Sequence, residues 1–492
     1  MINWCSSGGK KGLAPLAVAL VGSIAFVRWT EPVALGVQHR AQSPTAAQLG
    51  YRKITSEQYL PPYFSKELVD NLVTVWDGED AKEASGASPE RLKKIAYRRY
   101  GFVEAPYDNG GAPINFMPGK KGTPGEKGWA FSCLGCHAGT LLGHTIVGLG
   151  NNRVDQQTLM LDVARFTRKI AASAPIPEST MREAMPIPFG SAMGTNNGLG
   201  LAAGLIAFRS PDLELQSTPQ DFGNSAPPMD TPPWWNLKKK SKHFYIDGLV
   251  AAGPRAMEHA LLFPENSGQF VRDREKDFED IRQWMDTLEP PKYPLPVNEP
   301  LARSGEQAFG RACASCHGTY GPGGSYPEKQ IPIDVVGTDR MRLDGMTRKF
   351  REYYNTTWFA HYGEKKGLEP RGYIAPPLDG IWASAPYFHN GSVPTLRGVL
   401  NSRQRPALWK AVRDGDPNQT YDLKNVGLAL EPGVTTIPPQ ATDADRRRFY
   451  DARVDSSGRA YVPGQTKVGH TFPDSRLSPD EKEAVLEYLK TL

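Results

Sequence analysis

Several features that are common in other proteins are scarce in this chain. It lacks long blocks of Lys and Arg: the formal net charge is +5, and the densest run, Lys238-Lys239-Lys240, is interpreted as a solvated loop. A surface that follows a nucleic acid backbone is therefore excluded. No second stretch of about twenty apolar residues follows the N-terminal one, so we expect the remainder to be soluble. Strand patterns are few, whereas Gly (49) and Pro (43) are abundant, which predicts a helical and loop-rich fold.

Cysteine is also rare, with five residues in 492, yet four of the five belong to two copies of the pattern C-x-x-C-H. The copies are Cys133, Cys136 and His137, and Cys313, Cys316 and His317. Two thiols three residues apart can each form a thioether with a haem vinyl group, and the adjacent His then lies under the iron as its proximal ligand. The sequence therefore predicts two covalently bound c-type haems.

Other uses of these cysteines explain the pattern less well. A thioredoxin-like pair does not require the His, and a structural zinc site would have to combine Cys, Cys and His from both halves of the chain. A disulfide within either pair would close a very short loop and would stabilise the fold little.

The N-terminus resembles an export signal, because two lysines precede an apolar stretch from Leu13 to Val27. Covalent haem attachment of this kind belongs to the periplasmic side of bacteria, which agrees with export. No clear small-residue cleavage site follows Val27, so residues 1–30 are interpreted as either a signal peptide or an N-terminal membrane anchor. We expect the protein in the periplasm.

A proline-rich segment divides the chain. Residues 290–300 contain five prolines in eleven positions, which predicts a linker without helix. It would separate an N-terminal haem domain at 50–289 from a C-terminal cytochrome c domain at 301–492. Apolar periodicity predicts a helix at Asp277 to Leu288, and a second helix, capped by Ser478, at the C-terminus. The predicted fold is mainly α with extensive loops, with two cytochrome c-like haem domains in tandem.

The second haem has three candidate sixth ligands, His470, His389 and His361. His470 is the first choice, because it precedes the C-terminal helix by a short loop and that helix packs near the haem in small cytochrome domains. His389 lies between aromatic residues and turn formers, where an imidazole can equally hold the loop by hydrogen bonds.

No single ligand candidate stands out for the first haem, so an open iron site is our hypothesis. A site that activates peroxide or oxygen needs a distal acid–base group, and Glu258 and His259 are titratable residues in an otherwise apolar segment. The alternative is that Glu258 is a helix-surface carboxylate and His259 a hydrogen-bonded structural residue. Trp129 and the pair Trp234-Trp235 are candidates for an electron relay, or else pack in the core.

At this point the motifs resemble the diheme cytochrome c peroxidase and MauG superfamily, and within it the branch that includes the rubber oxygenase RoxA. The resemblance spans roughly Tyr51 to Leu492 and rests on the segments FSCLGCHAGT, DTPPWWNLKKK, RACASCHGTY, APPLDGIWASAPYFHNGSVPTL and VGHTF. It implies a catalytic N-terminal haem with His137 proximal and the distal side open. It also implies an electron-transfer haem held by His317 and His470, with Trp235 as the relay. Members of the superfamily often bind calcium between the domains, but no ligands can be named in this chain.

The resemblance implies two functions of different chemistry. The first, which we predict, is a peroxidase that reduces hydrogen peroxide with electrons from a periplasmic donor such as a small cytochrome or copper protein. The second is a dioxygenase that cleaves an isoprenoid carbon–carbon double bond with O2. A third alternative, a plain electron-transfer cytochrome, requires protein ligands on both sides of each iron.

Overall fold

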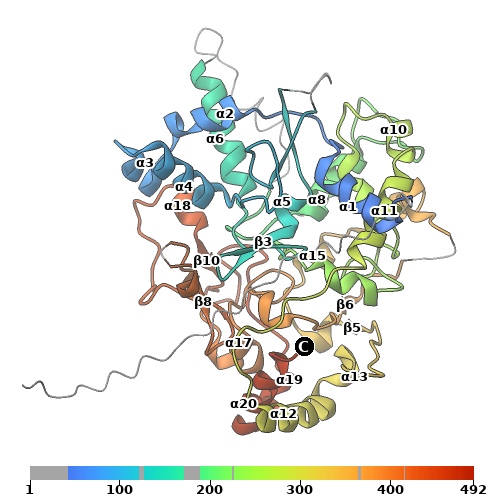
Figure 1. Ribbon diagram of the computed structural model, residues 1–492. Coiled ribbons are helices and arrows are strands. Elements are labelled where there is room, and N and C mark those ends of the chain that lie inside the picture. Colours follow the sequence, from blue (N-terminus) through green and yellow to red (C-terminus); the bar gives the residue numbers. More distant parts are fainter. Residues whose placement is uncertain (1–42, 121–126, 171–188, 224–226, 364–366, 415) are drawn as a thin grey trace, which may run out of the picture. The chain divides into compact units, whose positions relative to one another are not determined.

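The computed structural model describes residues 43–120, 127–170, 189–223, 227–363, 367–414 and 416–492. Residues Pro44–Leu492 form one compact unit, whose elements are labelled in Figure 1. The predicted signal peptide or anchor at residues 1–30 lies outside the described residues. In the described part of the chain, no helix is both long and apolar enough to cross a membrane.

Helices supply most of the regular structure, as the sequence predicted. The α-helices are α1 (Ala46–Ser56), α2 (Lys66–Asn71), α3 (Gly78–Ala84), α4 (Pro89–Tyr100), α5 (Leu134–His137), α6 (Gln156–Ile170), α8 (Gly198–Ala207), α9 (Arg255–Glu258), α10 (Gly268–Arg272), α11 (Glu275–Met285), α12 (Glu299–Ala312), α13 (Ala314–His317), α14 (Ile333–Val336), α15 (Met341–Asp344), α16 (Arg348–Tyr354), α17 (Leu396–Leu400), α18 (Asp443–Arg447), α19 (Phe472–Arg476) and α20 (Pro479–Leu489). The 3-10 helices are η1 (Leu72–Val75), η2 (Trp234–Lys239), η3 (His259–Leu261), η4 (Trp358–Ala360), η5 (Ile381–Ala383), η6 (Ser402–Gln404) and η7 (Pro417–Gln419).

The strands are short and pair only two at a time among the described residues. They are β1 (Phe116–Pro118) with β2 (Trp129–Phe131), β3 (Ala138–Leu141) with β4 (His144–Val147), β5 (Gln330–Pro332) with β6 (Gly372–Ile374), β7 (Leu408–Lys410) with β10 (Phe449–Asp451), and β8 (Tyr421–Asp422) with β9 (Gly427–Leu428). Every pair is antiparallel. The β3–β4 hairpin begins at the residue after His137, so it continues directly from the first motif.

Each C-x-x-C-H motif is accompanied by a tightly packed helix pair. Helix α1 packs on α11 in the first half, and α12 packs on α20 in the second. Both pairs approach closely at a glycine: a Cβ built on Gly50 would lie 2.0 Å from the carbonyl oxygen of Asp280, and one on Gly305 would lie 1.9 Å from that of Ala484. A side chain at either position would therefore force the two helices apart.

The predicted C-terminal cap is present, and the predicted linker is shorter than its proline content indicated. Ser478 and Glu481 form a capping box at the start of α20. Helix α12 begins at Glu299, inside the predicted 290–300 linker, because the Asn298 side chain accepts a hydrogen bond from the Leu301 amide. Pro300 lies in the first turn of the helix, where a missing N–H costs nothing.

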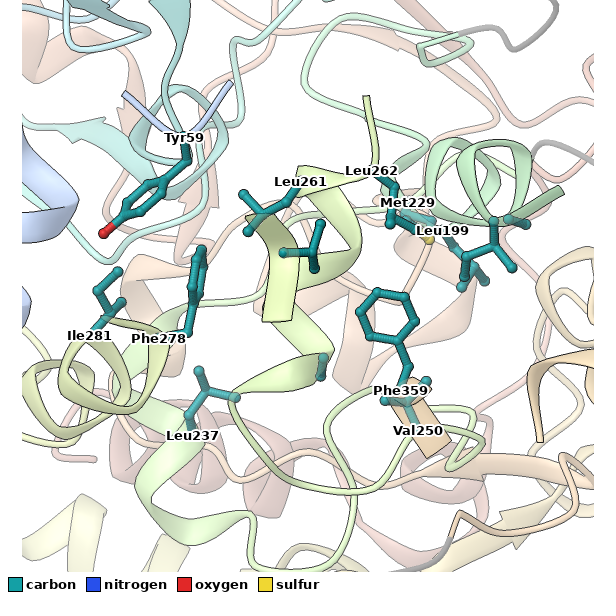
Figure 2. Packing of buried hydrophobic residues seen from close by; sticks show 14 of the residues in the cluster. Tyr59, Leu199, Met229, Leu237, Val250, Leu261, Leu262, Phe278, Ile281 and Phe359 are labelled. Carbon is teal, nitrogen blue, oxygen red and sulfur yellow. The ribbon is translucent and has the colours of Figure 1, made fainter. Parts of the chain in front are cut away.

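Among the residues that the structure describes, the buried apolar side chains form two large clusters, one around each motif, and a smaller third one. The first includes Leu134, Trp234 and Phe278, and Figure 2 shows part of it. The second includes Phe309 and Trp235. The adjacent residues Trp234 and Trp235 thus belong to different clusters, so η2 lies where the two clusters meet.

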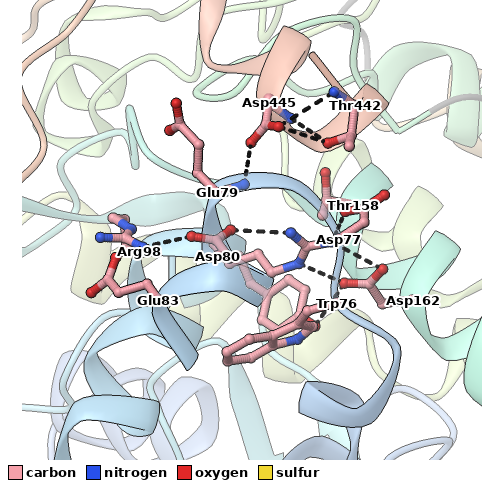
Figure 3. A network of polar contacts seen from close by, with 12 residues as sticks. Trp76, Asp77, Glu79, Asp80, Glu83, Arg98, Thr158, Asp162, Thr442 and Asp445 are labelled. Carbon is pink, nitrogen blue, oxygen red and sulfur yellow. Dashed lines mark hydrogen bonds and ion pairs between the residues drawn. The ribbon is translucent and has the colours of Figure 1, made fainter. Parts of the chain in front are cut away.

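Polar contacts connect the N-terminal helices with α18, and Figure 3 shows the bond between Asp445 of α18 and Glu79 beside the ion pairs of Asp80. Asp80 is fully buried and forms ion pairs with Arg98, Arg99 and Arg448. Arg99 also pairs with Asp162 at 2.7 Å. In the same region Arg447 pairs with Asp155 at 2.6 Å, and the Asp445 carboxylate accepts a hydrogen bond of 3.2 Å from the Glu79 amide. Charged residues of the N-terminal helices and residues near α18, which are far apart in the sequence, are therefore in contact in this buried region.

Replacing Asp80 by alanine is expected to lower the free energy of unfolding by about 3–5 kcal/mol, because buried guanidinium groups would lose their shared partner. Urea unfolding followed by circular dichroism measures this loss. The matched control is Asp70→Ala, which breaks an exposed pair with Lys66 and should cost about 0–1 kcal/mol. Equal losses in the two variants would contradict the structural role of the network.

The same network gives a pH dependence of stability. Burial acts to raise the pKa of Asp80, but Arg448, Arg98 and Arg99 together hold it below its usual value. A carboxyl whose pKa is lower in the folded state stabilises the fold above its unfolded pKa, and that contribution is lost as the pH falls through the folded pKa. The difference between wild type and Asp80→Ala should therefore shrink in acid.

Candidate functional site

The first motif is held in a single helical turn by buried asparagines. Helix α5 begins directly after Cys133 and ends at His137. The Asn151 side-chain amide donates to the carbonyl oxygens of Gly135 at 2.9 Å and Gly101 at 2.8 Å, and the Asn151 backbone amide donates to Cys136 O at 2.8 Å. These bonds satisfy the carbonyl groups of Gly135 and Cys136, which the short helix leaves without partners, and that of Gly101 at the end of α4.

Burial raises the pKa of both thiols of the first motif. The pKa of the Cys133 thiol rises to about 11 and that of Cys136 to about 12, so both are neutral thiols near pH 7. Among the described residues, no three His, Cys, Asp or Glu side chains come together as a metal-binding group. The two motifs therefore do not combine into one zinc site, and no ligands for calcium can be named.

His137 is packed against a tryptophan. The imidazole stacks on the Trp234 ring, with centroids 4.4 Å apart and planes 20° from parallel. Burial lowers the pKa of His137 to about 3, which keeps the ring neutral. A neutral imidazole is the form that binds a metal, so the residue suits the role of proximal ligand.

The second motif lies at the end of α12, where α13 carries Cys316 and His317. His317 Nδ1 lies 2.9 Å from the carbonyl oxygen of Pro376. Because a carbonyl only accepts, Nδ1 carries the proton, and Nε2 is left with a free lone pair. A backbone hydrogen bond of this kind orients a metal-binding histidine.

His470 lies opposite His317, with ring centroids 6.1 Å apart. Two imidazoles at this spacing would leave room to hold one iron between them. The observed spacing therefore fits a His–iron–His arrangement. Burial, together with the proximity of His317 and Arg405, lowers the pKa of His470 to about 3, so this imidazole is also neutral.

The loop around His470 is fixed by its backbone. His470 has a φ of +46°, which is uncommon for a residue other than glycine. Its amide donates to Val336 O at 2.6 Å, and its carbonyl accepts from Arg405 at 3.1 Å. The preceding Gly469 runs against the backbone of residues 337–338, where a Cβ would lie 2.2 Å from the carbonyl carbon of Gly337. The position of the imidazole is thus set by surrounding backbone.

The other two histidine candidates differ in their position: His389 lines the same cavity as His470, whereas His361 does not. His389 packs on the Tyr373 ring with centroids 4.3 Å apart, and its carbonyl accepts a bond of 2.9 Å from the Asp230 amide. These contacts agree with the structural alternative for His389. His361 is exposed, and its carbonyl accepts from Arg255 at 2.7 Å.

One cavity of about 770 Å³ is lined by both motifs and by His470. Apolar side chains form much of its wall beyond the motifs, including Leu199, Ala202, Met257, Phe263, Phe278 and Met285. Native interiors are close-packed, so an apolar space of this size requires a large apolar occupant. The thiol pairs, the neutral imidazoles and the apolar wall fit covalently attached haem.

His259 and Glu258 are both buried but differ in their relation to the cavity. His259 lines the cavity, its Nε2 lies 3.3 Å from the Tyr354 hydroxyl, and its Nδ1 has no partner. Glu258 is fully buried rather than on the surface, and it is not among the lining residues. Burial, followed by repulsion from Glu275, raises the pKa of Glu258 to about 8. Of the two candidates, His259 is the one placed to meet a bound molecule.

Helix η2 touches the first motif and the segment whose Pro376 carbonyl bonds to His317. Trp234 stacks on His137, whereas Trp235 is buried in the second cluster and donates from Nε1 to Asp379 O at 2.8 Å. Asn236 donates from its side chain to Pro377 O at 3.2 Å, next to the Pro376 carbonyl that holds His317. Trp129 lies in the third cluster, away from both motifs.

Sequence reasoning therefore singled out the tryptophan pair but missed Asn236 and Pro376. Two segments that stand out in the sequence, DTPPWWNLKKK and APPLDGIW, contain these residues. The fold brings the two segments into contact, which the sequence alone did not indicate.

Comparison with known proteins supports a haem assignment. Residues 372–410 match a family described as RoxA-like, cytochrome c-like. An uncharacterized protein y4iM of Sinorhizobium fredii is 29% identical over 244 residues, which are 43% of this chain and 53% of that protein. An uncharacterized protein y4iJ of the same organism is 35% identical over 133 residues, which are 25% of this chain and 18% of that protein. The chain thus spans about half of the first relative and less of the second.

The matched segment contains β6, η5, α17, β7 and the turn that bears His389. This match supports a RoxA-related haem protein with covalently bound haem c, and it indicates a haem-based oxidoreductase.

Proposed function

We propose that this protein is a periplasmic oxidoreductase with two c-type haems, which reduces hydrogen peroxide at the first motif and takes up electrons through the second. The observation that carries the proposal is the inequality of the two motifs. His317 has a second imidazole opposite it, at 6.1 Å between ring centroids. His137 instead stacks on Trp234, and within the described residues no imidazole pairs with it in that way. One iron would then be closed by protein ligands and the other would keep a face for substrate.

A haem with one open face supplies a binding place for peroxide and reversible one-electron chemistry. Reduction of hydrogen peroxide to two waters takes two electrons and two protons, so a proton-transferring side chain is needed as well. His259 offers Nδ1 without a protein partner in the wall of the cavity. The Tyr354 hydroxyl can donate to Nε2 or accept from it, so a proton gained or lost at Nδ1 can be matched by that hydrogen bond.

Electrons would travel between the motifs through η2. Trp234 is in ring contact with His137, and the Asn236 side chain bonds to the carbonyl of Pro377. The neighbouring carbonyl of Pro376 bonds to His317 Nδ1. This chain of contacts joins one proximal histidine to the other. It favours Trp234, together with the predicted Trp235, as the aromatic part of the relay.

A paired assay on the purified protein tests this function: peroxide turnover with a reduced donor, such as a small cytochrome or copper protein, against oxygen uptake with polyisoprene. We expect peroxide turnover and no oxygen uptake. Oxygen uptake with polyisoprene in the absence of peroxide turnover would overturn the proposal. The controls are Cys133→Ala, which removes one thioether at the first motif, and Cys313→Ala, which does so at the second.

The second candidate is a dioxygenase that cleaves isoprenoid double bonds. The family match favours it, and so does the apolar wall of the cavity near His259, formed by residues such as Leu199, Met257 and Phe263. An apolar wall suits a hydrocarbon, whereas an acid–base histidine suits peroxide. The oxygen-uptake arm of the assay distinguishes the two.

A further inference from the structure

Lys240 is a buried cation in the wall of the cavity. It follows η2 directly and is 9% exposed. Its ammonium group donates to the carbonyl of Phe244. Among the described residues, no carboxylate oxygen lies within 4.0 Å of the Lys240 ammonium nitrogen, so the group has no ion-pair partner. Burial lowers the pKa of Lys240 to about 8. A buried ammonium without a carboxylate partner is unfavourable, so the position requires an explanation.

Arg342, on α15, lies close enough to affect the same ammonium. It lines the cavity, is 5% exposed, and its positive charge acts on the pKa of Lys240. Its Nε and Nη2 atoms donate to Asp247 at 3.2 and 2.9 Å. Its Nη1 atom meets the thioether sulfur of Met229, which is a weak acceptor. Two cations near each other in a buried wall repel, and an anion between them would relieve the repulsion.

The neighbouring carboxylates are already occupied. Glu328 accepts hydrogen bonds from three consecutive backbone amides, those of Ser241 at 3.0 Å, Lys242 at 2.9 Å and His243 at 2.7 Å. Asp247 is held by Arg342 and by the Leu249 amide at 2.9 Å. These carboxylates favour the charged form of Lys240 from a distance but do not pair with it.

Acidic side chains are also scarce in the rest of the cavity wall. Its basic residues are Lys240, Lys329, Arg342 and Arg476. Its one acidic residue among the described positions is Asp230, whose pKa burial raises well above the usual value. An occupant that brings carboxylates would therefore balance the charge of this wall.

We propose that Lys240 and Arg342 form the binding site for a propionate carboxylate of a haem attached at these motifs. Thioethers hold the vinyl side of such a ring and histidine holds its iron, while the two propionates remain to be neutralised. An ammonium and a guanidinium atom facing one cavity provide that neutralisation by charge-assisted hydrogen bonds. The inference rests on haem attachment, which is one part of the proposed function, and not on peroxide turnover.

The test compares Lys240→Met, which keeps the length of the side chain and removes the charge, with Lys240→Arg, which keeps the charge. The matched control is Lys242→Met, two residues away and exposed. Three measurements are made on the full chain: haem content by the pyridine haemochrome assay, midpoint potentials by spectroelectrochemical titration, and propionate vibrations by resonance Raman.

Loss of the cation favours the oxidised, more positive iron. In Lys240→Met we expect the one-electron reduction equilibrium of one haem to shift tenfold toward the oxidised form. This shift lowers the midpoint potential of that haem by about 59 mV. Its propionate bands should move as well. Lys240→Arg and Lys242→Met should match the wild type in both measurements.

Unchanged potentials and unchanged propionate bands in Lys240→Met would overturn the inference. If that variant does not yield folded protein, Lys240→Gln replaces it, and the same shift supports the inference while its absence overturns it. None of these measurements involves peroxide. An inactive protein with the expected shift would thus defeat only the proposed peroxidase, and an active protein without the shift would defeat only the propionate site.

Discussion

Replacing His470 by glycine is expected to convert one of the two haems from six-coordinate to five-coordinate and to leave the spectrum of the other unchanged. The imidazole of His470 lies opposite that of His317 at the spacing of two axial ligands of one iron. Glycine is the suitable replacement because His470 has a φ of +46°, which glycine adopts without strain. The backbone amide of residue 470 can then still donate to Val336 O, and its carbonyl can still accept from Arg405. Absorption and magnetic circular dichroism spectra of the oxidised and reduced protein measure the change.

Added imidazole should occupy the space left in His470→Gly and restore the six-coordinate spectrum. That rescue separates loss of a ligand from loss of structure. A matched control is His389→Gly, which removes another buried imidazole from the wall of the same cavity, one that packs on Tyr373. If His470→Gly left both spectra unchanged, the role of sixth ligand would pass to His389 or to a methionine.

Replacing His259 by leucine is expected to reduce kcat/KM for hydrogen peroxide by about 10²- to 10⁴-fold, the usual contribution of a positioned acid–base group. Leucine keeps much of the packing against Phe359, whose ring centroid lies 4.3 Å from that of His259. The variant removes Nδ1, which has no partner in the protein and belongs to a residue that lines the cavity. Stopped-flow mixing of the reduced protein with peroxide measures the rate.

The matched control for His259→Leu is His243→Leu. His243 is equally buried and also has an unpartnered Nδ1, but it does not line the cavity. It should retain the peroxide rate within a few-fold. Tyr354→Phe removes the hydroxyl bonded to Nε2 and should change the pH profile of the rate more than its maximum. If His243→Leu and His259→Leu lost the same activity, the effect would reflect packing rather than proton transfer.

The parts of this site that are local in sequence could be predicted from the sequence, and those built from distant segments could not. A C-x-x-C-H motif contains its own two thioether positions and its proximal ligand. Ser478 and Glu481 predict the start of α20, because both residues of a capping box lie within four positions of the sequence. The sequence did not show which tryptophan touches His137. Trp234 and Trp235 are adjacent residues of the same type, and they differ only in the apolar cluster to which each belongs in the fold.

Long-range backbone contacts could not be predicted either, because they join segments that are distant in the sequence. The carbonyl of Pro376 holds His317 from 59 residues away, and the carbonyl of Pro377 accepts from Asn236 across 141 residues. Carbonyl groups are present at every position, so no residue type signals their use. Lys240 was interpreted as part of a solvated run, because three consecutive lysines are usually exposed. The fold instead buries the third of them.

The charge network that joins the N-terminal helices to α18 also bears on the order of folding. Asp155 finds Arg447 across 292 residues, and Asp80 finds Arg448 across 368. During N-to-C synthesis, Asp80 and Asp155 emerge well before the arginines with which they pair. Until those arginines arrive, the buried carboxylates beside α4 and α6 lack part of their compensation, and this region cannot reach its final stability. The N-terminal helices therefore become fully stable only after α18 has joined them.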